Sequence, residues 1–330
     1  MKRLIFDKLI LVLTFINICA FSQKVTSQKF PKDTSYTLYS AAKKMYKKYP
    51  QANLMRDVLP ANVKVKKNVV YKKIGNRELL LNIYYPAKFK NKVVPALLMI
   101  HGGGWSSGDI SLVIPMAERI AAKGFVTVAV EYRLSPEALY PAAIYDLKDA
   151  IKWMRENAKQ YHIDTSKVAV YGCSAGGQLS ALIGATNDNI KFEDRNNNLK
   201  VSSNVQAVID VDGVVDFFGK SSEEIIKPSG KPTAAQKWFG VSAKVNPEIW
   251  KDAGAINHVS KYYPPILFIN SAVPRFHAGQ HEMVQLLKKF KIFYEIYTMP
   301  QTIHTFWLFS PWFEQTINYT LNFLQKVFYK

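Results

Sequence analysis

The chain has 330 residues, of which 48% are hydrophobic, and it contains 16 Gly and 16 Pro. This composition excludes a disordered tail, a collagen-like chain and a coiled coil, and it leaves one large globular domain or two small ones. The net charge of +19 is concentrated near the N-terminus, because residues 23–92 carry 17 basic and 3 acidic side chains. A solvated surface and a face that attracts an acidic polymer both fit this charge. Nucleic acid is not an expected partner, since no binding module for it is recognisable.

The first 22 residues are typical of a signal peptide. Three basic side chains accompany an apolar stretch over residues 9–21, which is shorter than the ~20 residues that span a bilayer. Cleavage after Ser22 would release a mature chain beginning at Gln23, without stable membrane insertion. A lipoprotein site at Cys19 and an N-terminal core helix are the alternatives. The sequence therefore predicts a secreted or periplasmic protein.

Residues 23–65 are expected to form a basic N-terminal arm that leads into one domain over residues 66–330. In this domain, short apolar runs alternate with segments of helical period, which predicts a sheet wound with crossover helices. The predicted strands cover 69–74, 79–85, 95–100, 126–130, 168–171, 205–211, 266–269 and 293–297. The predicted helices cover 110–123, 142–157, 176–186, 279–289 and 311–328. No helix separates the first two strands, so the sheet should begin antiparallel and then run parallel.

Residues 212–263 break this alternation. They carry Gly, Pro, Ser and Lys with scattered aromatic residues and show no clear period. Long irregular segments inside a compact fold are usually functional or disordered, so we expect an inserted cap here.

A predicted strand runs into Gly172-Cys173-Ser174-Ala175-Gly176, and a predicted helix follows. G-x-S-x-G between a strand and a helix is typical of a nucleophile elbow. Such a sharp turn crowds the backbone on both sides of the serine, so Gly172 and Gly176 need to lack a Cβ. Ser174 is therefore the candidate nucleophile, and a loop that merely links strand and helix is the alternative.

A second glycine-rich segment, His101-Gly102-Gly103-Gly104-Trp105, directly follows the predicted strand 95–100. Residues without side chains let backbone N–H groups approach a developing oxyanion. We assign the N–H groups of Gly103, Gly104 and Ala175 to such an oxyanion hole. A phosphate-binding loop fits less well, because the segment lacks the lysine of a P-loop.

These two motifs, the segment Glu131–Glu137 and a late His304 resemble, in that order, the α/β-hydrolase superfamily, in its branch of hormone-sensitive-lipase-like and carbohydrate esterases. The resemblance covers about residue 69 to the C-terminus. It implies an eight-stranded, mostly parallel sheet with the nucleophile after the fifth strand, and a catalytic domain over 66–330 with residues 212–263 as its cap. It also implies that residues 132–134 and Asp146 brace the structure beneath the site.

The resemblance implies a triad in the order serine, acid, histidine. His304 follows the last predicted strand by a short loop and is assigned as the general base. Most relatives place an aspartate after the seventh strand, but residues 270–275 hold no carboxylate. We therefore assign Glu282, the next acid along the chain, as the partner of His304. Asp212 or Asp216 after the sixth strand, or no acid at all, remain alternatives.

No metal or other cofactor is expected. His277 and His281 have the spacing of a helical zinc site, but no H-E-x-x-H motif accompanies them.

Aromatic residues beside the site suggest how a substrate binds. Flat rings suit a sugar or an acyl chain, so Trp105 and Trp307 are assigned as substrate-binding residues, with simple core packing as the alternative. A small polar cap favours a short acyl group, and the basic N-terminal region favours an acidic polysaccharide. The sequence thus predicts a secreted serine esterase that removes acetyl groups from an acylated carbohydrate. A serine exopeptidase, a lipase-like esterase and a non-catalytic binding protein of the same fold are the alternatives.

Overall fold

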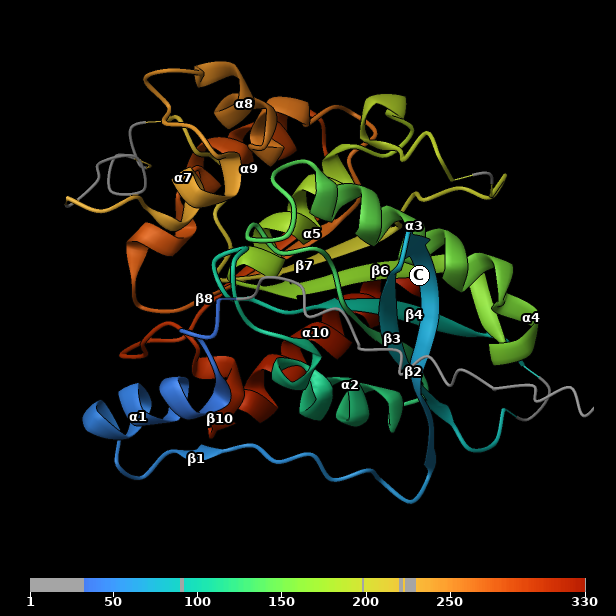
Figure 1. The fold of residues 1–330 in the computed structure, drawn as a ribbon. Helices are drawn as coiled ribbons and strands as arrows, with labels where there is room; N and C mark the ends of the chain where they lie inside the picture. The colour runs from blue at the N-terminus through green and yellow to red at the C-terminus, as the bar shows by residue number, and fades with distance from the viewer. Residues whose placement is uncertain (1–32, 90–91, 198, 220–221, 223–229, 330) are drawn as a thin grey trace, which may run out of the picture.

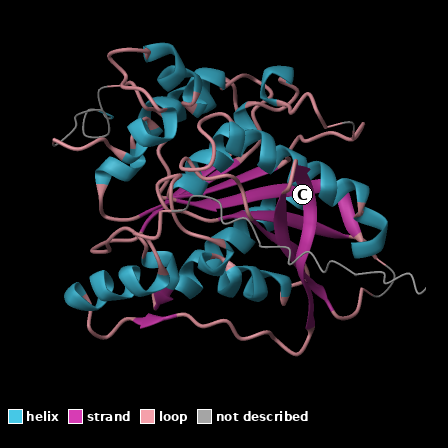
Figure 2. Ribbon diagram, viewed as in Figure 1, coloured by secondary structure: helices cyan, strands magenta, loops and turns pink. Residues whose placement is uncertain are grey.

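The computed structural model describes residues 33–89, 92–197, 199–219, 222 and 230–329. The predicted signal peptide, residues 1–22, lies outside them. At the centre is an eight-stranded sheet in the order β2-β3-β5-β4-β6-β7-β8-β9 (Figures 1 and 2). Its strands are β2 (Val63–Ile74), β3 (Arg77–Pro86), β4 (Val94–Ile100), β5 (Val126–Val130), β6 (Ile163–Cys173), β7 (Ala207–Val211), β8 (Ile266–Asn270) and β9 (Tyr294–Thr298).

The sheet has the mixed direction that the sequence predicts. The pairs β2–β3 and β3–β5 are antiparallel, and every later pair is parallel. All eight predicted strands are found, and β6 is the fifth of them in chain order. The carboxyl ends of the parallel strands therefore share one edge of the sheet, which is where an α/β protein places its site.

Helices cover both faces of the sheet, so the central strands are buried throughout. Along β4, Leu98 packs into the core of one face and Leu97 into the core of the other. The first face is covered by α3 (Ala142–Glu156), α4 (Ala158–Tyr161), α5 (Ala175–Ala185) and α9 (Gln280–Lys289). The second is covered by α1 (Leu38–Lys48), α2 (Ile114–Ala121) and α10 (Trp312–Phe328). None of the helices in the described ranges is long and apolar enough to cross a membrane.

The described part of the predicted cap, within residues 212–263, consists of short helices joined by irregular segments. It contains α7 (Ala234–Phe239), α8 (Pro247–Asp252) and the short helix η4 (Ala255–His258), which lie above α5 in Figure 1. Trp238 and Trp250 are fully buried and join the core cluster of the α5 face. The cap is therefore packed into the main core rather than laid over it.

The N-terminal region differs from the surface arm that we predicted. Helix α1 begins with a capping box at Thr37 and buries Met45 against the face that also holds α2 and α10. Strand β1 (Asn53–Leu54) pairs with β10 (Phe309–Ser310), just before α10. Part of the basic charge is thus carried on a docked helix, with Lys43, Lys44, Lys47 and Lys48 exposed.

Substitution of the docked residue Met45 tests whether α1 belongs to the cooperative fold. Met45 is 0% exposed, so Met45→Ala should lower the free energy of unfolding by about 2–5 kcal/mol, measured by urea denaturation. The exposed Lys47→Ala on the same helix is the control and should change it by less than about 0.5 kcal/mol. Equal stability of both variants would mean that α1 frays independently.

Candidate active site

Ser174 lies at the sharp turn between β6 and α5. Its backbone has φ 57° and ψ −121°, a conformation that a residue with a side chain rarely adopts. A Cβ on Gly172 would lie 1.9 Å from the carbonyl oxygen of Gly176, so only glycine fits at that position. The N–H of Ser174 donates to the carbonyl of Val211 at 2.7 Å, which ties the turn to the end of β7. The elbow predicted from the sequence is therefore present.

His304 connects Ser174 to a buried carboxylate. Its Nε2 lies 2.8 Å from Ser174 Oγ, and its Nδ1 lies 2.6 Å from Asp212 Oδ2. Because an ionised carboxylate can only accept, Nδ1 carries a proton and Nε2 is free to accept the proton of the serine. The imidazole is thus held in the tautomer that a general base requires.

The acid is Asp212, and the assignment of Glu282 was wrong. Glu282 is exposed on the first turn of α9, while both ring nitrogens of His304 are taken by Ser174 and Asp212. Asp212 directly follows β7, and its N–H donates to the carbonyl of Ile269 on β8 at 3.0 Å. A residue after β7 therefore lies beside the loop after β8, where the resemblance led us to expect the acid.

Asp216, the other alternative, points elsewhere. Its Oδ1 accepts a hydrogen bond from the N–H of Phe218 at 2.8 Å.

Burial and hydrogen bonding set opposite charge states on the two partners. Burial raises the pKa of Asp212, but hydrogen bonds from His277 and His304 outweigh it and hold this pKa well below its ordinary value. Burial lowers the pKa of His304; Asp212 opposes this shift, and the nearby positive charges of Lys44 and Arg275 add to it. At neutral pH the pair is thus a carboxylate beside a neutral imidazole.

The glycine-rich loop after β4 lies against the nucleophile. A Cβ on Gly102 would lie 3.0 Å from the Cβ of Ser174. Gly103 has φ 128°, and a Cβ there would lie 2.1 Å from the carbonyl oxygen of Ser107. In the described ranges, no residue accepts a hydrogen bond from the N–H of Gly103 or Gly104. These donors, together with the N–H of Ala175 at the start of α5, remain the candidate oxyanion hole.

Two side-chain arrangements brace the structure beneath the site, as the resemblance implied. Tyr132 stacks on His101 with ring centroids 4.6 Å apart, and its hydroxyl donates to the carbonyl of His101 at 2.9 Å. Arg133 forms two hydrogen bonds of 2.8 Å to the two oxygens of the buried Asp146.

Trp105 offers no face on which a sugar could stack. It is 7% exposed and packs face to face on Trp238, with centroids 4.9 Å apart and planes 9° apart. Its Nε1–H donates to Oε1 of Gln178 at 2.9 Å. The ring is part of an aromatic cluster under the cap, which contradicts a sugar stacking on it; a substrate-binding role beside the acyl group stays a prediction.

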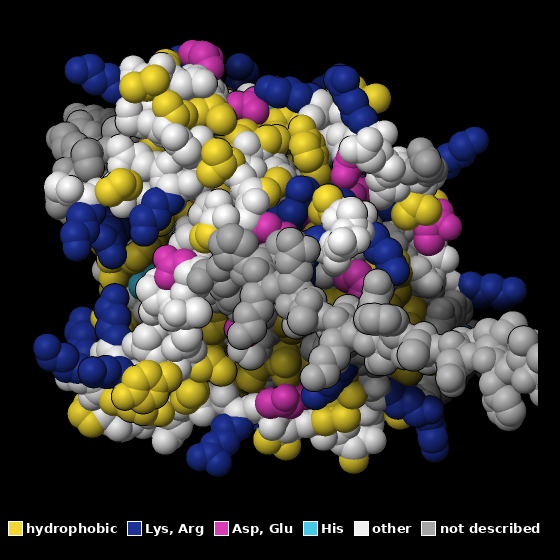
Figure 3. All heavy atoms as spheres, in the orientation of Figure 1, with side chains coloured by type: hydrophobic (Ala, Val, Ile, Leu, Met, Phe, Trp, Pro, Cys, Tyr) yellow, Lys and Arg dark blue, Asp and Glu magenta, His cyan; other side chains and the backbone are white. Residues whose placement is uncertain are grey.

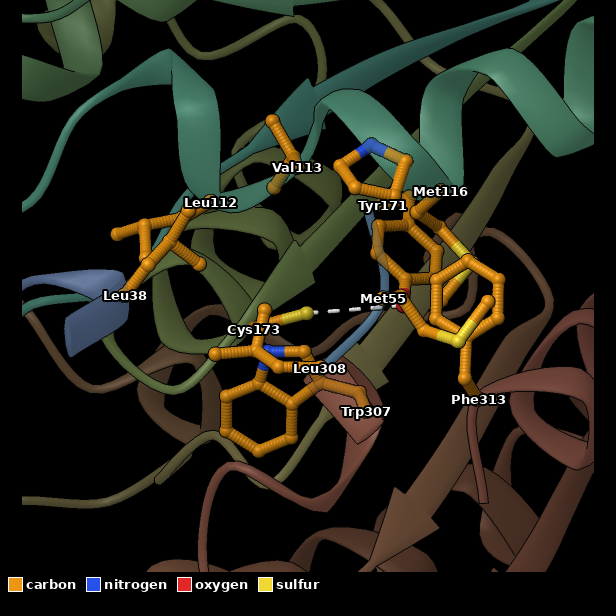
Figure 4. Close-up of a pocket in the computed structure, with 11 residues that line it drawn as sticks. Leu38, Met55, Leu112, Val113, Met116, Tyr171, Cys173, Trp307, Leu308 and Phe313 are labelled. Atoms are coloured by element: carbon orange, nitrogen blue, oxygen red, sulfur yellow. Dashed lines mark hydrogen bonds between the residues drawn. The ribbon is translucent and has the colours of Figure 1, made fainter. Parts of the chain in front are cut away.

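Trp307 is likewise buried, at 4% exposed, and its ring meets His304 edge-on at 5.0 Å. The indole lines an apolar cavity of about 10 Å³ together with Cys173, Leu112 and Phe313 (Figure 4). This cavity has room for about one water molecule and for no acyl chain. Trp307 therefore braces the imidazole, and its assignment as a substrate-binding residue for a sugar or an acyl chain is contradicted.

The sequence did not connect two residues of the short helix η5 (Pro274–His277) with the triad. Phe276 stacks on the ring of His304, with centroids 3.4 Å apart and planes 10° apart. His277 Nε2 lies 2.9 Å from Asp212 Oδ1. Both belong to the loop after the seventh sheet strand, where we expected the acid. This place beside the expected acid is the sequence signal that could have identified them.

No group of three potential metal ligands occurs within the part of the chain that the structure describes. His277, which we weighed with His281 as a possible ligand pair, is directed at Asp212 instead.

Basic side chains lie near His304. Figure 3 shows Lys and Arg gathered at the left of the view, over α1 and near the cap, with a histidine visible between them. Lys44 on α1 and Arg275 on η5 are both exposed and both close enough to His304 to lower its pKa. The approach to Ser174 is therefore positively charged.

Comparison with known proteins agrees with this geometry. The BD-FAE family model matches residues 81–275. Esterase LipC of Mycobacterium tuberculosis is 31% identical over 196 residues, which are 58% of this chain and 47% of LipC, so the chain spans about half the length of this relative. Thermogutta terrifontis esterase 2 has a similar structure, with a TM-score of 0.66, 24% identity, and coverage of 82% of this chain and 96% of that one.

A truncated carbohydrate esterase from gut microbiota is also similar, with a TM-score of 0.63 and 23% identity over 83% of this chain and 100% of that one. The sheet order and these likenesses establish the α/β-hydrolase fold that the sequence predicted.

Removal of the charge on Asp212 should slow the reaction of Ser174 far more than any change at Glu282. Asp212→Asn leaves the imidazole with the wrong tautomer, so labelling of Ser174 by an organophosphate should slow by about three to four orders of magnitude. Glu282→Gln should label at the wild-type rate. The measurement is the second-order labelling rate followed by mass spectrometry, and a slow Glu282→Gln variant would restore the original assignment.

The pH dependence of this labelling should report the pKa of His304. The imidazole is active when neutral and its pKa is lowered, so the rate should fall only below the ordinary imidazole pKa of about 6.5. Lys44→Gln removes a nearby positive charge, which raises the pKa of His304 and moves the acid limb to higher pH. Lys123→Gln, an exposed lysine at the opposite edge of the sheet, should leave the profile unchanged. An unmoved limb in Lys44→Gln would contradict the charge effect.

Proposed function

Because the chain belongs to the BD-FAE family, we propose that it is a serine ester hydrolase that works through a covalent acyl-enzyme. The observation that carries this proposal is the hydrogen-bonded series from Ser174 through His304 to Asp212. The name of the relative LipC, an esterase, supports the same class of reaction.

Each step of the proposed reaction uses a group of this chain. Ser174 Oγ attacks the ester carbonyl while His304 Nε2 takes its proton, and Asp212 stabilises the imidazolium that forms. The N–H groups of Gly103, Gly104 and Ala175 bind the oxyanion. His304 then returns the proton to the leaving alkoxide, and water repeats the sequence on the acyl-enzyme to release the acid and restore Ser174.

The acyl group is proposed to be short, with acetyl as the preferred group. Trp105 directly follows the oxyanion loop and is anchored to Gln178, one helical turn beyond Ser174. Its ring stacks on Trp238 and contacts Phe217, with centroids 5.6 Å apart in the second pair. This buried aromatic cluster fills the space beside the loop, so that a long acyl chain would have to displace it.

The alcohol side is proposed to be a carbohydrate, and an acidic polysaccharide fits best. The positive charges of Lys44 and Arg275 beside His304 favour a substrate that carries carboxylates. The carbohydrate esterase from gut microbiota shares the fold, and we extend the carbohydrate in its name to this chain as part of the proposal.

Turnover of an acetylated acidic polymer should fall with added salt, because salt screens surface charges. Turnover that is independent of salt would contradict the acidic substrate.

Secretion or a periplasmic location is part of the same proposal, since a polysaccharide substrate lies outside the cytoplasm. It is supported by the signal-peptide pattern of residues 1–22. N-terminal sequencing of the protein recovered from the medium or periplasm tests it, with Gln23 as the expected first residue.

The alternative functions have less support. A non-catalytic binding protein was suggested by the missing acid, and Asp212 removes that reason. The lipase-like alternative predicts a preference for long acyl chains, and the test that follows distinguishes it from the proposed function.

Acyl preference is the test of the proposed function. The chain should hydrolyse p-nitrophenyl acetate with kcat/KM at least about tenfold above that for the octanoate, and Ser174→Ala should abolish both activities. Trp105→Leu should open space beside the oxyanion loop for a longer acyl chain. The ratio of kcat/KM for the octanoate to that for the acetate should then rise by about tenfold, a size typical of discrimination by methylene groups in a pocket.

Trp250→Leu is the matched control for this test. Trp250 is fully buried in the cap, donates its Nε1–H to the carbonyl of Val241 and contacts Phe217, but it makes no ring contact with Trp105 in the described ranges. Its acyl preference should equal that of the wild type. A wild type that prefers octanoate would support a lipase-like esterase instead.

A further inference from the structure

Asp212 is bound by two imidazoles, of which the proposed reaction uses only one. His304 contacts Oδ2 at 2.6 Å, and His277 contacts Oδ1 at 2.9 Å. We propose that His277 is a positioning residue for the reaction: it fixes the carboxylate of Asp212 in the orientation that holds His304 against Ser174. This inference rests on the proposed function, and it adds a residue that does not touch the substrate.

The carboxylate of Asp212 needs such a partner because it is fully buried. Its side chain is 0% exposed, so water cannot satisfy its lone pairs or hold its orientation. Oδ1 accepts from the N–H of Ser271 at 2.7 Å and from Nε2 of His277, which leaves Oδ2 to face His304. Loss of the His277 donor would leave one backbone N–H on Oδ1, and the carboxylate plane would be free to rotate away from the imidazole.

The helix η5 acts on both members of the catalytic pair. Phe276 lies flat on one face of the His304 ring, and the next residue, His277, reaches Asp212. The edge contact of Trp307 restrains the same imidazole from another side. Consecutive residues of one short turn therefore restrain the base and the acid together, so a change at His277 should reach Ser174 through the geometry of this pair.

The hydrogen bond defines which replacement can preserve the function. Since Asp212 is ionised, His277 must donate through Nε2–H. Glutamine can place an amide N–H near the position of Nε2, whereas the amide of asparagine is too short to reach it and leucine carries no donor. His277→Gln is therefore the conservative variant, and His277→Asn and His277→Leu are the disruptive ones.

The experiment measures steady-state hydrolysis of p-nitrophenyl acetate and organophosphate labelling of Ser174 in the full chain. In His277→Leu and His277→Asn, kcat and the labelling rate should fall by about ten- to a hundredfold with KM unchanged, the effect of losing a hydrogen bond to a charged group. His277→Gln should stay within about threefold of the wild type. His281→Leu, a change at an exposed histidine on α9, is the control and should behave as the wild type.

A spectroscopic measurement separates positioning from general damage. The proton shared by His304 and Asp212 should give a low-field resonance in the wild type and in His277→Gln, and it should broaden or shift in His277→Asn. Should His277→Leu fail to fold, His277→Asn carries the test, because it keeps a polar side chain at this partly exposed position.

The two proposals fail in different ways. Wild-type hydrolysis with unchanged kcat, labelling and resonance in His277→Asn overturns the role of His277 and leaves the esterase function standing. Absence of hydrolysis in a wild type whose Ser174 labelling still depends on His277 overturns the esterase function and leaves the positioning role standing. A kcat loss in His277→Gln equal to that in His277→Asn also overturns positioning through the hydrogen bond.

Discussion

The buried hydrogen bond between Asp212 and His304 is the interaction on which the rest of the site depends. It fixes the imidazole tautomer, and through Nε2 it fixes the direction of the Ser174 hydroxyl. The sharp turn at Ser174, the glycine-rich loop and η5 all converge on this pair. If the carboxylate were neutral or turned away, His304 could not act as a general base for Ser174. The charge and orientation of Asp212 therefore decide whether the site is active.

Asp210 shows that burial alone does not set this state. It lies on β7 two residues before Asp212, and both carboxyl groups are buried. Burial raises the pKa of Asp210 well above its ordinary value, because one backbone N–H, from Gly213, is the only hydrogen bond found for it in the described ranges. Asp212 receives three donors and stays ionised. The opposite pKa shifts of these two carboxyl groups thus arise from loop residues distant in sequence.

This dependence on distant donors explains what the sequence could and could not predict. The strands and the elbow follow from local signals, namely apolar runs and the crowding that requires Gly172, and the structure agrees with them. The identity of the acid does not follow from local signals. Its place in the chain favoured Glu282, and only the pairing of β7 with β8 shows that Asp212 lies beside His304. The burial of Trp105 likewise could not be predicted, because it depends on stacking with Trp238 in the cap, and the cap sequence shows no hydrophobic periodicity.

The pairing of β7 with β8 also explains why the acid can lie after either strand. Contacts continue past the end of β7, since the N–H of Asp212 donates to the carbonyl of Ile269 on β8. The N–H of Ser271, just after β8, donates to the Asp212 side chain. Carboxylates on the two loops would therefore reach the same imidazole. Because Asp212 follows β7, the loop after β8 supplies hydrogen-bond donors instead, and the position where we expected the acid holds the acid of the neighbouring loop.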